Sequence, residues 1–382
     1  MIDPAWPFFE QRHRDLARDL QGWCDDHLDD VHADDVDAAC RALVHNLGEA
    51  GLLDLCVGTP DSPPDVRSLA IARATLARAS GLADFAFAMQ GLGSGAISLF
   101  GDEEQRADWL PGVAAGSAIA AFALTEPDTG SDAANIACRA VRDGEEWIVD
   151  GEKTYISNGT IADVITLFAR TGTAEDGARG LSAFILPATA HGLTVAERIE
   201  VIAPHPLARL RLDGVRLPAS ALIGGEGDGF RIAMQTLNLF RVTVGAAALG
   251  FARRALDEAL SFSTVRKLGE ATLADHPVTQ ERLAEMATAI DASALLIARA
   301  AWQQDNGIAD NRRAAAMAKL HATEEAQRVI DMAVQLHGGL GVTRGAKVEE
   351  LYREIRALRI YEGASEVQRM VIARDLIREA HR

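Results

Sequence analysis

Residues 147–168 read WIVDGEKTYISNGTIADVITLF, and their pattern is that of β-strands. Two short apolar runs, Trp147–Val149 and Val164–Phe168, are rich in β-branched and aromatic side chains, which favour strands. The pair Asp143-Gly144 precedes the first run and the pair Asp150-Gly151 follows it. Such pairs are typical of turns between antiparallel strands, so the stretch predicts an antiparallel β-domain.

Further strand-like runs extend this pattern toward the C-terminus. Leu181–Leu186 is continuously apolar, and in Arg209–Val215 arginine and leucine alternate, as in a strand with one solvated face. We therefore assign residues 117–225 to a middle β-domain.

Helical spacing of apolar residues flanks the β-domain on both sides. Leu16, Leu20 and Cys24 form one helical stripe, and similar spacing returns from about residue 229. We therefore expect an N-terminal helical domain over residues 1–116 and a C-terminal helical bundle over residues 226–382. The predicted fold is mostly α with a central β-domain.

Within the C-terminal part, residues 245–250 read GAAALG. Because these side chains are mostly small, the run predicts that a neighbouring helix approaches closely here.

Composition and charge narrow the class of protein. The 382 residues include 38 Lys and Arg against 55 Asp and Glu, which gives a formal net charge of −17. This balance argues against nucleic acid or an anionic membrane as a partner, because both reward basic surfaces. The four cysteines form no C-x-x-C pair, and the longest uncharged stretch, residues 85–101, is interrupted by glycines. We expect a cytoplasmic protein with reduced thiols.

Several standard catalytic motifs are absent from the sequence. It contains no H-E-x-x-H, no G-x-x-x-x-G-K-[ST] and no G-x-S-x-G. The glycine-rich runs at residues 91–95 and 225–229 do not have the G-x-G-x-x-G spacing of a dinucleotide-binding turn. The ten histidines form no pair at metal-ligand spacing, so no metal site is expected.

Three segments carry candidate chemistry, each with a structural alternative. Residues 122–132, FALTEPDTGSD, offer hydroxyl and backbone N–H groups to a polar ligand, or form a plain turn. Residues 151–159, GEKTYISNG, combine an aromatic ring and a hydroxyl, which suit a flat heteroaromatic ligand, or form a strand that ends in an Asn-Gly turn. Residues 335–369 begin with a glycine run that ends a helix. They also contain Glu362 in an apolar context, which is either a catalytic base or an acidic residue near a helix N-terminus.

Together with residues 99–116, LFGDEEQRADWLPGVAAG, these segments resemble the acyl-CoA dehydrogenase family of flavoproteins in their order and separation. The resemblance covers nearly the whole chain. It implies an N-terminal helical domain, a β-barrel-like middle domain and a C-terminal four-helix bundle. It also implies bound FAD, a homotetramer, an acyl-CoA substrate and an electron-transferring flavoprotein as electron acceptor.

The resemblance also assigns residues to the cofactor. Tyr155 stands where the family usually has a tryptophan as an aromatic wall of the flavin, and Ser157 replaces the usual threonine but keeps a hydroxyl. Arg266 matches an arginine that meets the FAD pyrophosphate across a subunit interface, a role that suits its planar fork. Ala364 replaces a common threonine. The implied cofactor-binding residues are Phe122, Leu124, Thr125, Gly130, Ser131, Tyr155, Ile156, Ser157, Arg266, His276, Gln335, Gly338, Gly339, Ala364 and Glu366.

By the same resemblance, Glu362 is the catalytic base and Arg241 is an arginine that helps to position it. Some relatives carry the base one residue before this arginine, where the present chain has Phe240, which cannot accept a proton. The implied substrate-binding residues are Ser131, Asn238, Arg241, Glu362 and Gly363.

The implied reaction is the FAD-dependent α,β-dehydrogenation of an acyl-CoA thioester to a trans-2-enoyl-CoA. Glu362 removes the α-proton while a hydride leaves the β-carbon for the flavin. In the family, the flavin ribityl 2′-hydroxyl and the backbone N–H of the base polarise the thioester carbonyl. An acyl-CoA oxidase, a carrier-protein-linked acyl dehydrogenase and a non-catalytic flavin or acyl-CoA binding protein are the alternatives. The length and branching of the acyl chain stay open.

Overall fold

The computed structural model describes residues 4–28, 35–308 and 311–381, which divide into two compact units. The first unit contains the described residues within 1–31, 65–84 and 241–382, and the second contains those within 32–64 and 85–240. The predicted domain limits at residues 116 and 225 do not coincide with the limits of these units. The N-terminal helices are shared between the units, because chain segments distant in sequence pack together.

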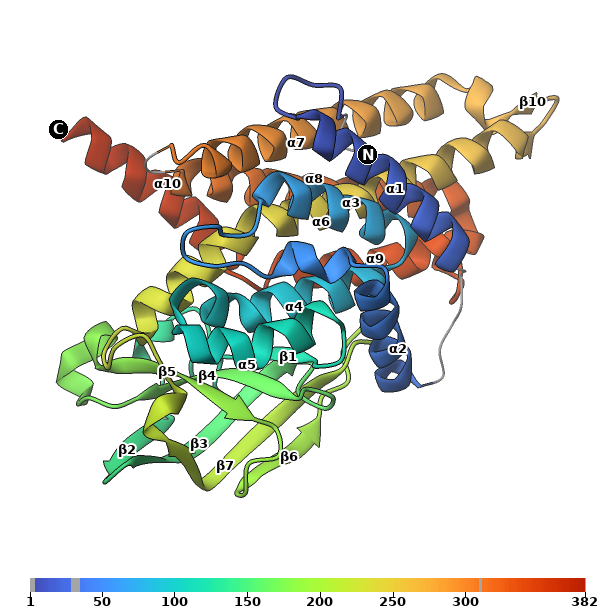
Figure 1. Cartoon of the computed structure of the whole chain (residues 1–382). Coiled ribbons are helices and arrows are strands. Elements are labelled where there is room, and N and C mark those ends of the chain that lie inside the picture. The colour runs from blue at the N-terminus through green and yellow to red at the C-terminus, as the bar shows by residue number, and fades with distance from the viewer. Residues whose placement is uncertain (1–3, 29–34, 309–310, 382) are drawn as a thin grey trace. The chain divides into compact units, whose positions relative to one another are not determined.

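The first unit is helical (Figure 1). In it, α7 packs against α8, α1 against α3, α3 against α7, and α8 against both α9 and α10. The C-terminal part of α6, from Arg241 onward, belongs to the same unit. The helices are α1 (Gln11–His27), α3 (Val66–Ala79), α6 (Gly229–Val265), α7 (Pro277–Asp305), α8 (Arg312–His337), α9 (Lys347–Leu358) and α10 (Ser365–Ala380).

The small-residue run in α6 brings two other helices close, as its sequence predicts. A Cβ atom on Gly250 would lie 2.4 Å from the carbonyl oxygen of Ala74 in α3. A Cβ atom on Gly245 would lie 3.2 Å from the carbonyl oxygen of Ala318 in α8. A side chain at Gly250 would therefore force α3 away from α6.

The second unit is built on an eight-stranded sheet in the order β6-β7-β3-β2-β4-β5-β8, with β1 paired to β4. Most neighbouring strands are antiparallel, as predicted, but β1 and β2 both run parallel to β4. The strands are β1 (Ala120–Ala123), β2 (Arg139–Asp143), β3 (Glu146–Ser157), β4 (Val164–Arg170), β5 (Leu181–Pro187), β6 (Leu193–Arg198), β7 (Leu207–Pro218) and β8 (Leu222–Ile223).

Helices of the second unit cover one face of this sheet. They are most of α4 (Gly81–Phe100), α5 (Glu103–Ala114) and the first turns of α6, and α2 (Val36–Glu49) belongs to the same unit. Ile97 of α4, Leu110 of α5 and Ile232 of α6 share a buried cluster with Phe168 of β4 and Ile185 of β5. A second cluster contains Trp147, Val149 and Leu210. The mostly α fold with a central sheet, predicted from the sequence, is confirmed.

One predicted turn is wrong. Asp143-Gly144 does form the turn between β2 and β3, but Asp150-Gly151 lies inside the continuous strand β3. The register of β3 against β7 shifts between Val149 and Gly151, so the glycine supports a β-bulge instead of a turn. Its φ of 147° and the nearby Cα of Cys138, 2.8 Å from the position of a Cβ, explain why glycine is needed there.

Helix α6 is long and apolar enough to cross a membrane by length and composition alone. In the structure, 78% of its most apolar window is buried. Buried core helices pass the same test, so this helix is weak evidence for a membrane span.

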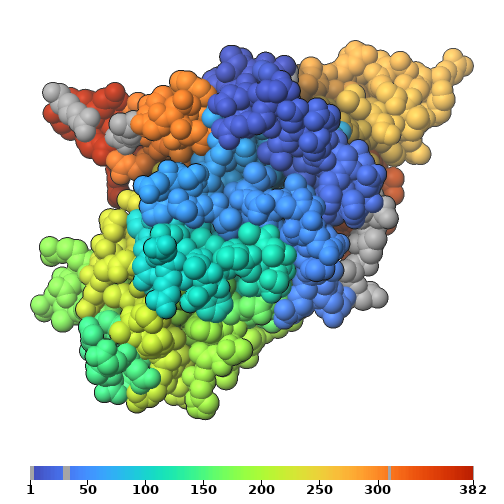
Figure 2. All heavy atoms as spheres, viewed as in Figure 1, coloured from blue at the N-terminus to red at the C-terminus, as the bar shows by residue number. Residues whose placement is uncertain are grey.

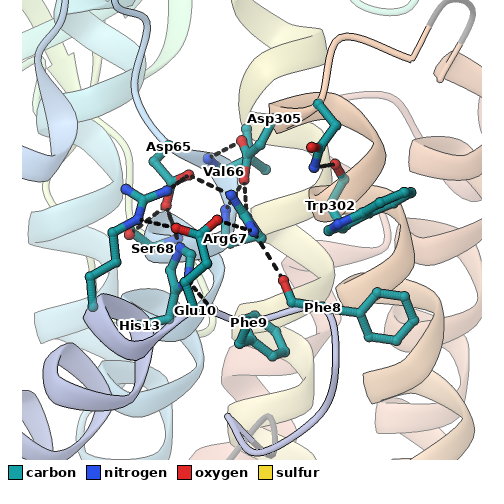
Figure 3. A network of polar contacts seen from close by, with 12 residues as sticks. Phe8, Phe9, Glu10, His13, Asp65, Val66, Arg67, Ser68, Trp302 and Asp305 are labelled. Atoms are coloured by element: carbon teal, nitrogen blue, oxygen red, sulfur yellow. Dashed lines mark hydrogen bonds and ion pairs between the residues drawn. The ribbon is translucent and has the colours of Figure 1, made fainter.

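Two carboxylates accept hydrogen bonds from the backbone N–H groups at the N-terminal end of α3 (Figure 3). Asp65 accepts a hydrogen bond from Ser68 N at 3.0 Å. Asp305, at the end of α7, accepts from Val66 N at 2.8 Å and from Arg67 Nε at 2.7 Å. Burial and the neighbouring Asp65 carboxylate raise the pKa of Asp305 to about 6, and its two oxygens accept hydrogen bonds from α3. The cluster thereby joins α3 to α7.

We predict that Asp305→Ala destabilises the protein by about 3 kcal/mol, because it removes the buried carboxylate that accepts from Arg67 Nε and leaves two backbone N–H groups without their acceptor. The measurement is the thermal unfolding midpoint followed by circular dichroism. Asp19→Ala, which removes one partner of an exposed ion pair with Arg18, is the control and should change stability by less than about 1 kcal/mol. Equal midpoints for the two variants would contradict the prediction.

Candidate active site

In the second unit, the segment 122–132 forms an ordered loop after β1. Glu126 and Thr129 exchange two backbone hydrogen bonds of 3.0 and 3.1 Å. The Glu126 carboxylate is buried and accepts hydrogen bonds from Ala137 N at 2.5 Å and Cys138 N at 2.9 Å. The glutamate therefore holds the loop from within.

A buried lysine of β3 joins this loop to the sheet. Lys153 is fully buried, and its Nζ donates to Glu126 Oε1 at 2.7 Å and to the carbonyl oxygen of Leu124 at 3.0 Å. Thr154 N donates to the carbonyl oxygen of Thr125 at 2.9 Å. The loop and the tip of β3 are thus fixed to each other by three contacts.

Tyr155 follows at once and has an unusual conformation. Its φ is 55°, in the left-handed region, and the register of β3 against β7 shifts between Lys153 and Ile156. Its side chain is 61% exposed, whereas Ile156 is buried and Ser157 is half-buried. A non-glycine residue in this region costs about 1–3 kcal/mol, and such strain is concentrated at functional sites. The bulge thus presents an aromatic ring outside the sheet.

The remaining predicted residues of this loop differ in exposure. Gly130 and Ser131 are exposed, and Thr125 is half-buried. Phe122 is half-buried and packs on Phe168, with ring centroids 4.8 Å apart. Leu124 is buried, so the backbone is the part of it that a ligand would reach.

In the first unit, Glu362 lies in the short segment between α9 and α10. Its φ is 51° and that of Gly363 is 90°. The Oε2 atom of Glu362 is buried and has no hydrogen-bond partner among the residues that the structure describes. Such an oxygen is free to accept a proton.

Three cationic side chains act electrostatically on the Glu362 carboxylate. Burial raises its pKa above the ordinary value, while Arg73, Lys319 and Arg241 act in the opposite direction. These residues come from α3, α8 and α6, and Asp84 of α4 is the nearby anion. Burial lowers the pKa of Arg241, and Glu362 partly restores it. The charges of Arg241 and Glu362 therefore act on each other.

Arg73 is the best-defined of these cations. It is buried, and its Nε and Nη2 donate to the two oxygens of Asp84 at 2.9 and 2.8 Å, while Nη1 donates to Thr243 Oγ1 at 3.1 Å. Burial lowers its pKa, but Asp84 outweighs this effect and raises the pKa overall. Burial raises the pKa of the Tyr361 hydroxyl, next to Glu362, and the charge of Arg73 acts in the opposite direction. The charge of Arg73 thus acts on the residue beside the candidate base.

The other predicted residues of the first unit lie at helix ends. The C-terminal end of α8 carries Gln335, Gly338 and Gly339, all exposed. Toward the C-terminal end of the segment 335–369, Ala364 is the N-cap of α10 and Glu366 lies in the first turn of that helix.

Arg266 and His276 lie where the chain runs from α6 to α7 through β9 (Lys267–Leu268) and β10 (Ala271–Thr272), a segment that projects from the helices of the first unit (Figure 2). Arg266 is exposed. His276 is the N-cap of α7, and its Nε2 atom is buried without a partner among the described residues. In the second unit, Asn238 is half-buried on α6 and Phe240 is buried.

Comparisons with known proteins agree with this arrangement. Family models of the acyl-CoA dehydrogenase N-terminal, middle and C-terminal domains match residues 10–117, 121–215 and 227–377. The chain belongs to the acyl-CoA dehydrogenase family. It is 36% identical over 342 residues to the mitochondrial short-chain specific acyl-CoA dehydrogenase of Bos taurus, and the match covers 88% of this chain and 82% of that protein.

Two solved structures show the same fold. A glutaryl-CoA dehydrogenase from Mycobacterium smegmatis in complex with FADH2 has a TM-score of 0.87 and 30% identity, over 97% of this chain and 95% of that one. A chain from the structure of the electron transferring flavoprotein of Acidaminococcus fermentans, which concerns flavin-based electron bifurcation, has a TM-score of 0.88 and 32% identity, over 97% of this chain and 99% of that one.

This acyl-CoA dehydrogenase family member is an oxidoreductase that uses FAD. Its residues fit the cofactor. An exposed, strained Tyr155 offers a ring to the flavin, and His276 has a buried Nε2 that needs a partner. Open space surrounds Gly338 and Gly339, since a Cβ on either would have no neighbouring atom within 4 Å, so ligand groups can approach their backbone.

The sequence did not point to Arg73, Lys153 or Lys319 as site residues. Lys153 lies within the segment 151–159, for which a strand was one of the two interpretations. A charged residue in a strand does not by itself show whether its side chain is buried. Arg73 and Lys319 stand in alanine-rich helices, where a single cation is typical of a solvated position. Their roles depend on which helices pack beside them.

We predict that Lys153→Met loosens the loop 122–132. The buried Glu126 carboxylate loses its cation, so the free energy of unfolding should fall by about 3–5 kcal/mol. FAD should also bind at least about tenfold less tightly, which corresponds to a loss of about 1.4 kcal/mol of binding free energy. Thermal unfolding and FAD titration of the apoprotein measure the two effects. Lys347→Met, which removes one partner of the ion pair with Glu350, is the control; unchanged FAD affinity in Lys153→Met would refute the role.

Proposed function

We propose that this protein catalyses the α,β-dehydrogenation of an acyl-CoA thioester to a trans-2-enoyl-CoA, with Glu362 as the base that removes the α-proton. The buried Oε2 atom of Glu362, which has no hydrogen-bond partner among the described residues, is the observation that carries the proposal. FAD, when bound, supplies the acceptor for the hydride that leaves the β-carbon.

The surroundings of Glu362 suit a base. Burial favours the neutral carboxylic acid and therefore increases the proton affinity of the carboxylate. Arg73, Lys319 and Arg241 oppose this effect, because their positive charges favour the ionised carboxylate. A base near the operating pH combines a high ionised fraction with a strong pull on the proton.

For the cofactor, we propose that Tyr155 packs against the flavin and that the loop 122–132 contributes hydroxyl and backbone groups. Arg266, Gln335, Gly338 and Gly339 would contact FAD phosphates and adenosine, and the free Nε2 of His276 suits the same part of the molecule. These roles rest on the positions of the residues in the family motifs and on the exposure described above.

We propose an electron-transferring flavoprotein as the electron acceptor, supported by the similarity to a chain from the Acidaminococcus fermentans structure. We also propose a homotetramer. The region that carries Arg266 exposes Val265, Leu268 and Val278, apolar side chains that a second subunit would cover. A cytoplasmic location agrees with the four free, buried cysteines.

We predict that acyl-CoA thioesters bleach the flavin under anaerobic conditions. A panel of straight, branched and aromatic acyl-CoA compounds, added to the FAD-loaded protein, should yield at least one that reduces it, because the proposed reaction delivers a hydride from the β-carbon to FAD. Reoxidation by an electron-transferring flavoprotein should be much faster than by oxygen. Rapid reoxidation by oxygen would identify an oxidase instead, and a flavin that no thioester reduces would contradict the proposal.

We predict that Glu362→Gln folds, retains FAD and reduces its flavin at least about 10²–10⁴-fold more slowly, because the amide cannot accept the α-proton. Stopped-flow absorbance with a thioester that the wild type accepts gives the rate, and thioester affinity is measured in parallel. Glu285→Gln, an exposed change on α7, is the matched control and should reduce at the wild-type rate. A near-wild-type rate in Glu362→Gln would place the base elsewhere.

A further inference from the structure

The Lys319 side chain is buried at the centre of the first unit and makes contacts that the proposed reaction has not yet used. It is 1% exposed, and its Nζ donates to the carbonyl oxygens of Tyr361 at 2.6 Å and Gly363 at 2.5 Å. A buried ammonium is costly unless hydrogen bonds compensate it. In this protein the compensation comes from two peptide carbonyls that bracket Glu362.

The Tyr361 carbonyl belongs to the same peptide unit as the N–H of Glu362. Because the peptide is planar and no cis bond occurs in the described chain, this C=O and N–H point in opposite directions. Lys319 holds the C=O and therefore fixes the direction of the Glu362 N–H. The Glu362 N–H has no hydrogen-bond acceptor among the residues that the structure describes.

The second contact holds the following turn. The carbonyl of Gly363 accepts from Lys319 and also from Gln368 Nε2 at 2.8 Å. A Cβ on Gly363 would lie 2.5 Å from this Nε2, so the glycine permits the close contact. With both ends held, Glu362 stays in its left-handed conformation, which a residue with a side chain rarely adopts.

The cation also acts on the electrons of the peptide. A charged donor makes a stronger hydrogen bond than a neutral one, and a hydrogen bond to a carbonyl polarises the peptide so that its own N–H becomes a better donor. Donors that are fixed in advance toward developing negative charge are a main source of catalytic power.

We propose that Lys319 is a positioning residue that aims and strengthens the Glu362 N–H as a hydrogen-bond donor to the thioester carbonyl oxygen of the substrate. The inference rests on the proposed function, in which that oxygen gains negative charge as the α-proton leaves. Lys319 thus couples the two tasks of one residue: the Glu362 side chain accepts the proton while its backbone N–H stabilises the enolate.

The direct test measures the carbonyl itself. A 2-enoyl-CoA labelled with ¹³C at the carbonyl is bound to the oxidised enzyme, and the labelled C=O stretch is read by difference infrared spectroscopy. Polarisation lowers this frequency in the wild type relative to free thioester. In Lys319→Met the band should move back toward the free value, whereas Glu362→Gln should keep the wild-type band because its N–H is unchanged.

Kinetics and pH provide readouts that a purely structural role would not move. In Lys319→Met, flavin reduction at saturating acyl-CoA should slow by about 10–10²-fold, less than the loss of a direct oxyanion donor, while KM changes less. Burial raises the pKa of Glu362 and Asp84 adds to this effect, while Arg73, Lys319 and Arg241 oppose it. Without Lys319 that pKa rises, so the acid limb of the pH–rate profile should move to higher pH.

Two further variants keep the test decisive. Lys319→Gln retains a hydrogen-bond donor but loses the charge, so it provides the test if Lys319→Met does not fold. It should shift the C=O band part of the way toward the free value. Gln368→Leu removes the neutral donor to the same Gly363 carbonyl and should leave the band near the wild-type position.

If the wild-type flavin is bleached by acyl-CoA but the Lys319 variants keep the wild-type band and rate, this inference is overturned and the proposed function stands. If no thioester bleaches the wild type, the proposed function itself fails.

Discussion

A charge removed from water must find its compensation inside the fold, and this constraint shapes both units of the protein. Lys153, Arg73 and Lys319 are almost entirely buried, and each is matched in a different way. Lys153 meets a carboxylate and a carbonyl, Arg73 meets a bidentate carboxylate, and Lys319 meets two carbonyls. For the two lysines the partners belong to a loop or turn with candidate chemistry, so the cost of burying these cations fixes the position of candidate functional groups.

The close approach of helices makes these contacts possible. Gly250 allows α3 to lie directly against α6, since any side chain there would meet the Ala74 carbonyl. Arg73, the residue before Ala74, can then donate to Thr243 on α6 while it binds Asp84. The small residues of α6 thus act indirectly: they bring α3 close enough for Arg73 to bind Thr243 of α6.

In the second unit, buried contacts hold the strained backbone of Tyr155 in place. Tyr155 adopts a positive φ that few residues with a side chain tolerate, and its neighbours on either side are held by buried contacts. Lys153 and Thr154 are tied to the loop 122–132, and Asn158, also at positive φ, donates to the Ala120 carbonyl at 3.0 Å. The strain at the tyrosine is therefore supported by the sheet, and it leaves an aromatic ring exposed where a planar ligand can pack against it.

The sequence alone determined the features that depend on local pattern: helical and strand-like zones in the right order, the glycine run that allows close packing, and Glu362 as the acidic residue in an apolar turn. Its motifs also indicated the family. The local sequence gave one wrong prediction, the turn at Asp150-Gly151, because an Asp-Gly pair suits a bulge inside β3 as well as a turn. Only the tertiary structure decided the contacts of Arg73, Lys153 and Lys319. A lone cation in a helix or strand has the same local pattern whether it faces water or a buried carbonyl. Its partner lies tens of residues away in the chain, and folding alone brings the two together.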